Sequence, residues 1–214
     1  DDGTVYVWSP YEQSTLKGIV EQIASWITRA PAEAVRLSGL QDKAALDELA
    51  HWIERLLGPE DAKGKRHSSR IRDLHDLARQ HYFHPLMGGR TSIKVVLPAV
   101  WTEDKQLWQH PAFQKYYRQD KTGRPIDPYK VLPVLPLGDD DKEDAVRDGT
   151  GAIRVYQDMI FAEDPSPRRH VDRQKLLLQY CELDTAAMVM IWMHWSCQTK
   201  GATHIQLLWI PKGL

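Results

Sequence analysis

The sequence Tyr180-Cys-Glu-Leu-Asp184 lies inside a run of helical apolar spacing that extends over residues 168–195. A tyrosine and an aspartate four residues apart on a helix project from one face, one turn apart. Such a pair can hold a metal ion through the carboxylate and orient a water molecule through the phenol. The spacing alone leaves a second reading open, in which Tyr180 is a core residue and Asp184 a surface acid.

The bulk composition restricts the class of protein. A chain of 214 residues suits one large domain with a substantial core. The formal net charge of −1 produces no global attraction to nucleic acid or membranes, so contacts with nucleic acid must come from local patches. Cys181 and Cys197 give neither a disulfide framework nor a paired-cysteine zinc motif, which fits a cytoplasmic location. The longest apolar stretch, residues 188–195, is too short to span a bilayer, so no membrane contact is expected.

Periodicity and capping residues indicate the elements of the N-terminal part. We expect a strand at residues 4–8, because it is rich in β-formers, and a helix over residues 11–28. A second helix is expected at residues 42–57. Asp42 is its expected N-cap, and Gly58-Pro59 its expected stop.

The middle of the chain carries a strand-to-helix or wholly helical signal at residues 71–81. A Gly-rich turn follows at residues 85–90. Thr91 or Ser92 can cap a short helix, which we expect to end near Pro98 because proline lacks the backbone N–H of a helix interior.

Residues 119–150 hold many prolines, glycines and acids and are expected to form a long irregular loop. Its acidic core, residues 138–144, is more typical of a solvated loop than of a metal site. The rest of the chain is expected to hold two helices and a terminal strand, at residues 151–161, 168–195 and 204–210.

Four stretches share a pattern with one known superfamily. They are Val5-Tyr-Val-Trp-Ser-Pro-Tyr11-Glu12, Arg72-Asp73-Leu74 with His81-Tyr-Phe-His-Pro85, Gly89-Arg-Thr-Ser-Ile-Lys94-Val-Val-Leu-Pro98 and Tyr180-Cys-Glu-Leu-Asp184. Their order resembles the tyrosine-type, DnaQ-like DEDD 3′–5′ exonucleases, and more closely a bacterial branch often joined to RecB-like nuclease modules. The resemblance implies a helix-rich α/β chain, with residues 1–214 forming a single RNase H-like, exonuclease-type domain.

The resemblance also implies a reaction. Members of the superfamily hydrolyse phosphodiester bonds at DNA or RNA ends with two divalent ions about 4 Å apart, and hard oxygen ligands suit Mg²⁺ or Mn²⁺. It implies that Asp184 ligates the ion that activates water and that Tyr180 orients this water. Glu12 would lie near the second ion, at a position where the wider superfamily usually carries Asp.

Three residues are candidates for contact with the nucleic acid. Trp8 adjoins Glu12 in the sequence and could stack on a base. Arg90 and Lys94 could contact backbone phosphates. Each basic residue of this kind is more often part of a solvated surface.

The resemblance leaves one part of the site outside the sequence. The first motif of the superfamily, an Asp-x-Glu on the first strand, should precede Val5, where only Asp1-Asp2-Gly3-Thr4 stand. We therefore expect the first strands to be missing and residues 5–8 to pair with a partner chain or a swapped copy. A RecB-like module in cis or a partner chain could complete the sheet. The alternative function is an exonuclease-like scaffold or nucleic-acid-binding module without catalysis.

Other polar residues carry weaker signals. Asp73 is expected to be structural, and nothing in the sequence orients His194 and Cys197 as a nucleophilic pair. Three further histidines are expected in surface or capping roles rather than as zinc ligands, because no cysteine is close: His75, His81 and His84.

Overall fold

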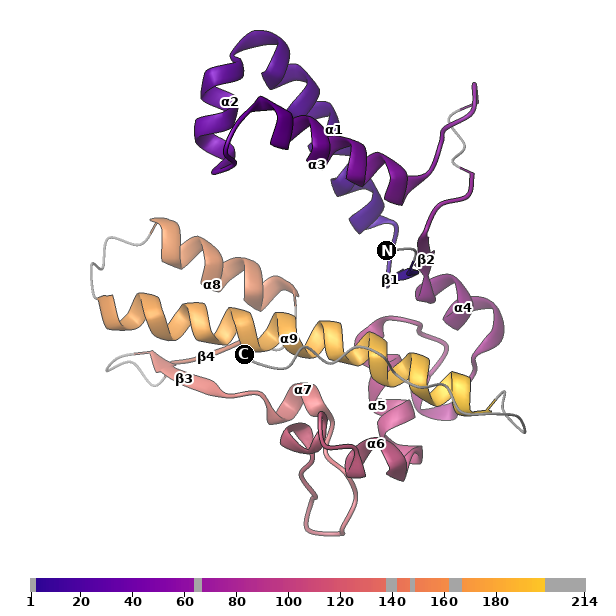
Figure 1. Cartoon of the computed structure of the whole chain (residues 1–214). Helices are drawn as coiled ribbons and strands as arrows, with labels where there is room; N and C mark the ends of the chain where they lie inside the picture. The colour runs from indigo at the N-terminus through magenta and orange to yellow at the C-terminus, as the bar shows by residue number, and fades with distance from the viewer. Residues whose placement is uncertain (1–2, 64–66, 138–141, 147–148, 162–166, 199–214) are drawn as a thin grey trace. The chain divides into compact units, whose positions relative to one another are not determined.

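The computed structural model of this chain describes residues 3–63, 67–137, 142–146, 149–161 and 167–198 (Figure 1). The chain is helix-rich with a small parallel strand pair, which agrees with the expected α/β class. It divides into two compact units, Asp1–Phe83 and His84–Leu214. The finer expectation of an RNase H-like topology stays a prediction.

The first unit combines a parallel strand pair with packed helices. β1 (Val5–Val7) runs parallel to β2 (Ile71–Asp73), with Val7 opposite Asp73. α1 (Tyr11–Arg29) packs against α3 (Lys43–Leu57), and α2 (Pro31–Ser38) contacts both. The expected strand at residues 4–8 and helix at residues 11–28 are therefore confirmed.

A hydrophobic core joins the strands to the helices of this unit. Apolar residues from α1 and α3 meet the strands because each helix carries one apolar stripe. The buried members are Val7, Ile53, Leu56, Leu57 and Ile71, and Leu16, Ile19 and Val20 pack on them. The core thus fixes the place where β1 runs into α1, which is also the place of Glu12.

Capping residues set the two ends of α3, as the sequence indicates. The Asp42 carboxylate accepts a hydrogen bond from the Ala45 backbone N–H at 2.9 Å. Gly58 ends the helix with a φ of 76°. A Cβ atom at Gly58 would collide with the His67 carbonyl oxygen, so glycine is required both by the backbone conformation and by the space.

Residues 71–81 form a strand followed directly by a helix, as expected. β2 leads into α4 (Leu74–His81), and the Asp73 carboxylate caps it by accepting from the His75 N–H at 2.8 Å. α2 has no counterpart among the sequence-based expectations, because eight residues hold too little periodicity to predict a helix.

The second unit is arranged around one long helix, α9 (Pro167–Gln198). α8 (Gly149–Phe161) runs beside the N-terminal half of α9, and α5 (Ile93–Glu103) also packs against α9 (Figure 1). The remaining elements are η1 (Pro85–Met87), α6 (Lys105–Gln109), η2 (Gln114–Tyr116), α7 (Pro128–Val131), β3 (Val134–Leu137) and β4 (Lys142–Ala145). The expected helices at residues 151–161 and 168–195 are confirmed.

Pro98 lies inside α5 and does not end it, so the expectation of a short helix ending near this residue was wrong. The proline ring removes one backbone hydrogen bond. Five neighbours in the same helix are buried, which stabilises its continuation to Glu103 more than the lost bond costs. These neighbours are Val96, Leu97, Ala99, Val100 and Trp101.

Residues 119–150 are more ordered than expected. α7 is a short helix capped by Asp127, and β3 and β4 form an antiparallel pair in which Val134 is opposite Ala145. The expectation of a long irregular loop was therefore wrong for these parts. Residues 138–141 of the acidic core, and the strand expected at residues 204–210, lie outside the described residues.

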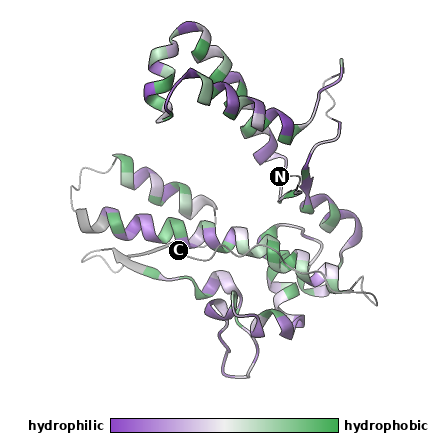
Figure 2. Ribbon diagram, in the orientation of Figure 1, coloured by the Kyte–Doolittle hydropathy of each residue, from purple (hydrophilic) through white to green (hydrophobic). Residues whose placement is uncertain are grey.

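α9 combines one buried face with residues of mixed polarity, as the alternating colours in Figure 2 show. From His170 to Cys197 it is long and apolar enough to cross a membrane by length and composition, with 33% of its most apolar window buried. A core helix passes the same test. The buried face packs inside the unit through Leu176, Tyr180, Leu183, Ala187, Met190, Ile191 and His194. The cytoplasmic location stays a prediction.

Candidate functional site

Tyr180 and Asp184 lie on adjacent turns of α9, on the face that packs against the rest of the second unit. Tyr180 is buried, and Asp184 is half-buried. Two helices bring partners to them. α5 presents Lys94 from its first turn, and α7 presents Tyr129, which is only 3% exposed. We refer to these four residues as the Asp184 cluster.

Two short hydrogen bonds organise the Asp184 cluster. The Lys94 ammonium donates to the Tyr180 hydroxyl, with 2.5 Å between Nζ and the phenolic oxygen. The Tyr129 hydroxyl donates to Oδ1 of Asp184 at 2.6 Å. Lys94 Nζ also lies 4.4 Å from the centroid of the Tyr180 ring and 5.2 Å from that of the Tyr129 ring. The cation is therefore held by a phenol oxygen and by two aromatic rings.

Tyr129 remains a neutral hydrogen-bond donor. Burial raises its pKa far above the ordinary value, and the negative charge of Asp184 raises it further. A phenol that stays protonated fixes one oxygen of the carboxylate and leaves Oδ2, to which no described residue donates a hydrogen bond. The adjacent Cys181 is a poor thiolate, because burial and then the charge of Asp184 raise its pKa.

Glu12 belongs to the first unit, where it lies in the first turn of α1. The Ser9 hydroxyl donates to Oε2 of Glu12 at 3.0 Å. Asp73 ends the neighbouring strand, and its pKa is raised mainly by burial, with smaller contributions from the charges of Asp76 and Glu12. Two carboxylates therefore stand at the carboxyl ends of two parallel strands, the edge at which open α/β sheets bind ligands.

The residues expected to touch nucleic acid lie in different surroundings. Trp8 is half-buried, and its ring lies 6.0 Å from that of His75 with an interplanar angle of 30°. Arg90 is exposed and follows the left-handed Gly89. Lys94 is part of the Asp184 cluster rather than of a solvated surface. Of the expected site residues, the second unit thus brings together Lys94, Tyr180 and Asp184.

The described side chains do not form a complete site for the expected divalent ions. Among the described residues, no group of three or more His, Cys, Asp or Glu side chains is arranged to hold a metal ion. The Asp184 cluster offers one carboxylate beside an ammonium group, and the first unit offers Glu12 with Asp73. These sets do not by themselves fit a magnesium or manganese site, which requires several oxygen ligands. The convergence of Glu12 and Asp184 on one ion pair stays a prediction.

A pair formed by His194 and Asp104, at the C-terminal end of α5, was not foreseen from the sequence. Nδ1 of His194, 5% exposed, lies 2.9 Å from Oδ2 of Asp104. Asp104 also caps α6 by accepting from the Gln106 N–H at 2.9 Å. Asp104 therefore orients the imidazole that the sequence left without an orienting partner. A hollow of about 300 Å³ here is also lined by Cys197.

Glu103, the residue before Asp104, forms a hydrogen bond with a second histidine, His84. His84 Nδ1 accepts from the Leu86 N–H at 3.1 Å, so the ring proton sits on Nε2 and is donated to Oε1 of Glu103 at 2.7 Å. His84 is thus a capping residue, as expected for this group of histidines. Neighbouring carboxylates at the end of α5 therefore anchor one histidine before this helix and another near the end of α9.

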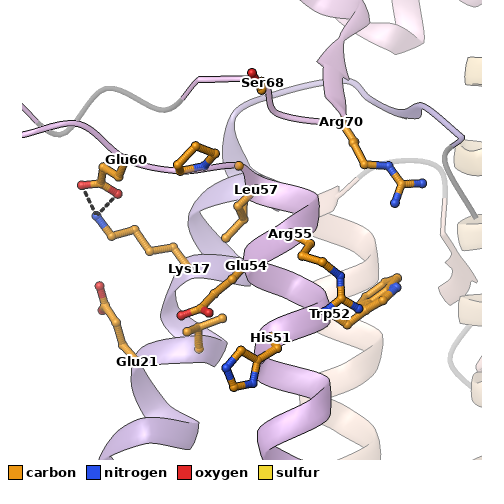
Figure 3. Close-up of a pocket in the computed structure, with 13 residues that line it drawn as sticks. Lys17, Glu21, His51, Trp52, Glu54, Arg55, Leu57, Glu60, Ser68 and Arg70 are labelled. Atoms are coloured by element: carbon orange, nitrogen blue, oxygen red, sulfur yellow. Dashed lines mark hydrogen bonds and ion pairs between the residues drawn. The ribbon is translucent and has the colours of Figure 1, made fainter.

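The first unit has a larger hollow of about 1050 Å³ between α1 and α3 (Figure 3). Its charges are balanced. Lys17 lies 3.5 Å from Glu60, and the Arg70 guanidinium donates to the Gly3 carbonyl at 2.7 and 2.9 Å. Glu21 and Glu54 face the same space. The hollow therefore presents no excess of positive charge to a phosphate chain.

No protein-family model, curated protein or solved structure matches this chain. The superfamily resemblance therefore rests on the sequence motifs alone. Tyr129 and Asp104 are the residues that sequence reasoning missed. The Asp127-Pro128 pair ahead of Tyr129 is a signal for a helix start, and it could have indicated that α7 presents Tyr129 from an ordered element.

Proposed function

We propose that this chain is the exonuclease-like module of a metal-dependent 3′–5′ exonuclease that acts at DNA or RNA ends, with Tyr180 and Asp184 in its site. The observation that carries the proposal is the pair of hydrogen bonds from Lys94 to Tyr180 and from Tyr129 to Asp184. They hold a phenol and a carboxylate in fixed directions on one helix face. Fixed direction is what positioning a reacting group requires.

Each residue has a part in the proposal. The Tyr129 hydroxyl donates to Oδ1 of Asp184, so Oδ2 is the oxygen that would bind a ligand. Lys94 brings a positive charge beside Tyr180, which favours a phosphate group at the same place. Glu12 is retained from the superfamily resemblance as a carboxylate near the second ion. Because the described residues do not make a complete ion site, we derive no catalytic step through the ions.

A second candidate function is an exonuclease-like scaffold that binds nucleic acid without hydrolysing it. It is favoured by a specific observation. The only carboxylate in the Asp184 cluster already accepts a hydrogen bond from Tyr129 and shares the cluster with the Lys94 ammonium. A site whose charge is balanced in this way attracts a divalent ion less strongly than an open group of carboxylates.

The test is hydrolysis of end-labelled single-stranded DNA and RNA by the whole protein, with Mn²⁺ or with EDTA. Asp184→Asn is compared with Asp172→Asn, which removes a carboxylate elsewhere on α9. We expect trimming from the 3′ end that requires Mn²⁺, persists in Asp172→Asn and is lost in Asp184→Asn. Equal trimming by both variants would remove Asp184 from the site. A folded protein without trimming would favour the scaffold.

A further inference from the structure

The segment from η2 to α7 is a basic stretch that the functional site has not absorbed. Between residues 115 and 130, five cations stand against Asp120 and Asp127. All five cations are exposed: Lys115, Arg118, Lys121, Arg124 and Lys130. The excess of positive charge is local, because the whole chain has a formal net charge of −1.

The two acids of this segment are used to build the backbone. Oδ1 of Asp120 accepts from the Thr122 N–H at 2.8 Å and from the Arg124 N–H at 3.0 Å. These hydrogen bonds, with that of the Thr122 hydroxyl, lower the pKa of Asp120. Asp127 accepts from the Tyr129 N–H at 3.0 Å. Both carboxylates also interact with a nearby cation, Asp120 with Arg124 and Asp127 with Lys130. Five cations against two acids still leave an excess of positive charge in this segment.

The segment is an ordered turn and not a loose tail. The Ile126 N–H donates to the Arg118 carbonyl at 2.8 Å, and the Asp120 N–H donates to the Arg124 carbonyl at 2.9 Å. Gly123 takes the left-handed conformation that the tip requires, with a φ of 79°. Ordering the backbone in advance reduces the entropy that a ligand must overcome on binding.

Two of the cations, Arg118 and Lys121, have no acidic partner within the described part of the chain, whereas Arg124 and Lys130 interact with Asp120 and Asp127. No ion pair joins Arg118, Lys121, Arg124 or Lys130 to a described carboxylate, and the Arg118 guanidinium donates only to backbone carbonyls beside it. Some surface cations elsewhere form ion pairs, such as Arg36 with Glu33 and Lys43 with Asp47. The turn thus carries an excess of positive charge, of which its own two acids compensate only a part.

Both ends of the turn are fixed to the same part of α9. At one end Lys115 pairs with Glu182, and at the other end Tyr129 donates to Asp184. Figure 1 shows the turn as a long loop that projects from the second unit between α6 and α7. The excess of positive charge is therefore carried by a projection whose two ends flank the Asp184 cluster.

We propose that this basic turn, residues 118–130, binds the phosphate backbone of a nucleic-acid strand and guides the strand toward the Asp184 cluster. The guiding role rests on the proposed function, whereas backbone binding does not. A tip made of Asp120-Lys-Thr-Gly-Arg124 has no apolar residue to insert into a bilayer, which favours a nucleic acid over a lipid surface.

The test is the binding of a fluorescein-labelled single-stranded DNA of about twelve nucleotides, in EDTA, over a range of salt concentrations. The triple variant Arg118→Gln, Lys121→Gln, Arg124→Gln is compared with Arg36→Gln, Lys43→Gln, Arg79→Gln. The second set removes the same charge from ion-paired cations of the first unit. Thermal unfolding confirms that both variants are folded.

We expect the turn variant to bind about 10- to 100-fold more weakly at 0.1 M salt, with the salt dependence reduced by about 2 in slope, because each phosphate contact releases counterions. The control variant should stay within about threefold of the wild type. Equal weakening in both variants, or no weakening in either, would overturn the proposal. So would a turn variant that loses affinity for vesicles containing phosphatidylserine while it keeps its affinity for DNA.

The result separates this inference from the proposed function, because EDTA removes hydrolysis from the measurement. Turn-dependent binding without trimming would leave the inference standing and overturn the proposed nuclease activity. Trimming together with DNA binding that is independent of the turn would support the proposed nuclease activity and overturn the inference about the basic turn.

Discussion

The carboxylates of the two units differ in what balances their charge. Asp184 has a buried phenol as donor and shares its cluster with a lysine ammonium. In the first unit, the Ser9 hydroxyl donates to Glu12 and the His75 backbone N–H donates to Asp73. Burial raises the pKa of Asp73, and the charges of Asp76 and Glu12 raise it further. The first arrangement stabilises a fixed geometry, whereas the second retains negative potential at a strand edge. A cation is therefore attracted more to the Glu12 edge than to Asp184 taken by itself.

The largest expected effect tests whether the geometry of Asp184 depends on the packing of α9. Leu183 is 0% exposed and lies next to Asp184 on the buried face. Leu183→Ala should lower the free energy of unfolding by about 3 kcal/mol, because it removes buried apolar surface and leaves a cavity. The measurement is urea unfolding followed by circular dichroism.

Leu178→Ala on the same helix is the control, because Leu178 is 62% exposed and should change stability by less than about 0.5 kcal/mol. Similar losses in the two variants would mean that α9 does not pack on the face described here. The comparison between the two carboxylate regions would then lose its basis.

The second effect concerns the first unit, where Gly58 sets the path from α3 toward β2. Gly58→Ala should lower the free energy of unfolding by about 2 kcal/mol, because the new methyl group meets the His67 carbonyl and the φ is positive. Gly39→Ala shares the positive φ but adds its methyl group into open space, so it should cost about 1 kcal/mol. Equal costs would show that the close approach to His67 contributes nothing.

A smaller effect isolates the hydrogen bond that distinguishes Asp184. Tyr129→Phe removes the only donor to Oδ1 among the described residues and should cost about 1.5 kcal/mol at neutral pH. The pH dependence has a definite sign. Since the pKa of Tyr129 is raised in the folded state, the unfolded chain ionises first as the pH rises past its ordinary value of 10.0, and the wild type loses stability there.

The Phe variant lacks this ionisation, so its stability should fall less steeply above about pH 10. Chemical unfolding at pH 8, 9, 10 and 11 measures the difference between the two proteins. Parallel pH profiles would contradict the burial of an un-ionised phenol beside Asp184.

The smallest effect is expected at the strand edge. Asp73→Asn keeps a good N-cap for α4 while it removes one of two charges that repel each other. Because the pKa of Asp73 is raised on folding, its charge becomes unfavourable as the pH rises above the ordinary value of 3.8. The melting temperature at pH 7 should therefore be unchanged or slightly higher. A clear decrease would mean that the carboxylate has a stabilising partner.

Local signals predicted much of this fold because they act over one or two turns. The period of apolar residues gave α1, α3, α8 and α9, and Asp42 and Gly58 marked the ends of α3. The same local reasoning failed at Pro98. Its effect on one hydrogen bond is outweighed by the burial of Val96, Leu97 and Trp101, which depends on tertiary contacts.

The candidate site was predictable only in part. The helical spacing of Tyr180 and Asp184 could be read directly, because the two residues share one element. The partner of Asp184 lies 55 residues earlier in the chain, on a four-residue helix with no periodicity of its own. His194 and Asp104 are separated by 90 residues, so no local pattern connects them. Contacts of this range follow from packing and not from propensity.

The adjacent carboxylates Glu103 and Asp104 have a consequence for changes in chain length. Glu103 forms a hydrogen bond with His84, and Asp104 forms one with His194. The two histidines come from segments on opposite sides of α5 in the sequence. A substitution at either position breaks one pair and leaves the other. An insertion or deletion of one residue in the last turn of α5, ahead of Glu103, rotates both carboxylates by about 100° around the helix axis and away from their histidines. Natural variation at this junction should therefore proceed by replacement of residues and not by indels.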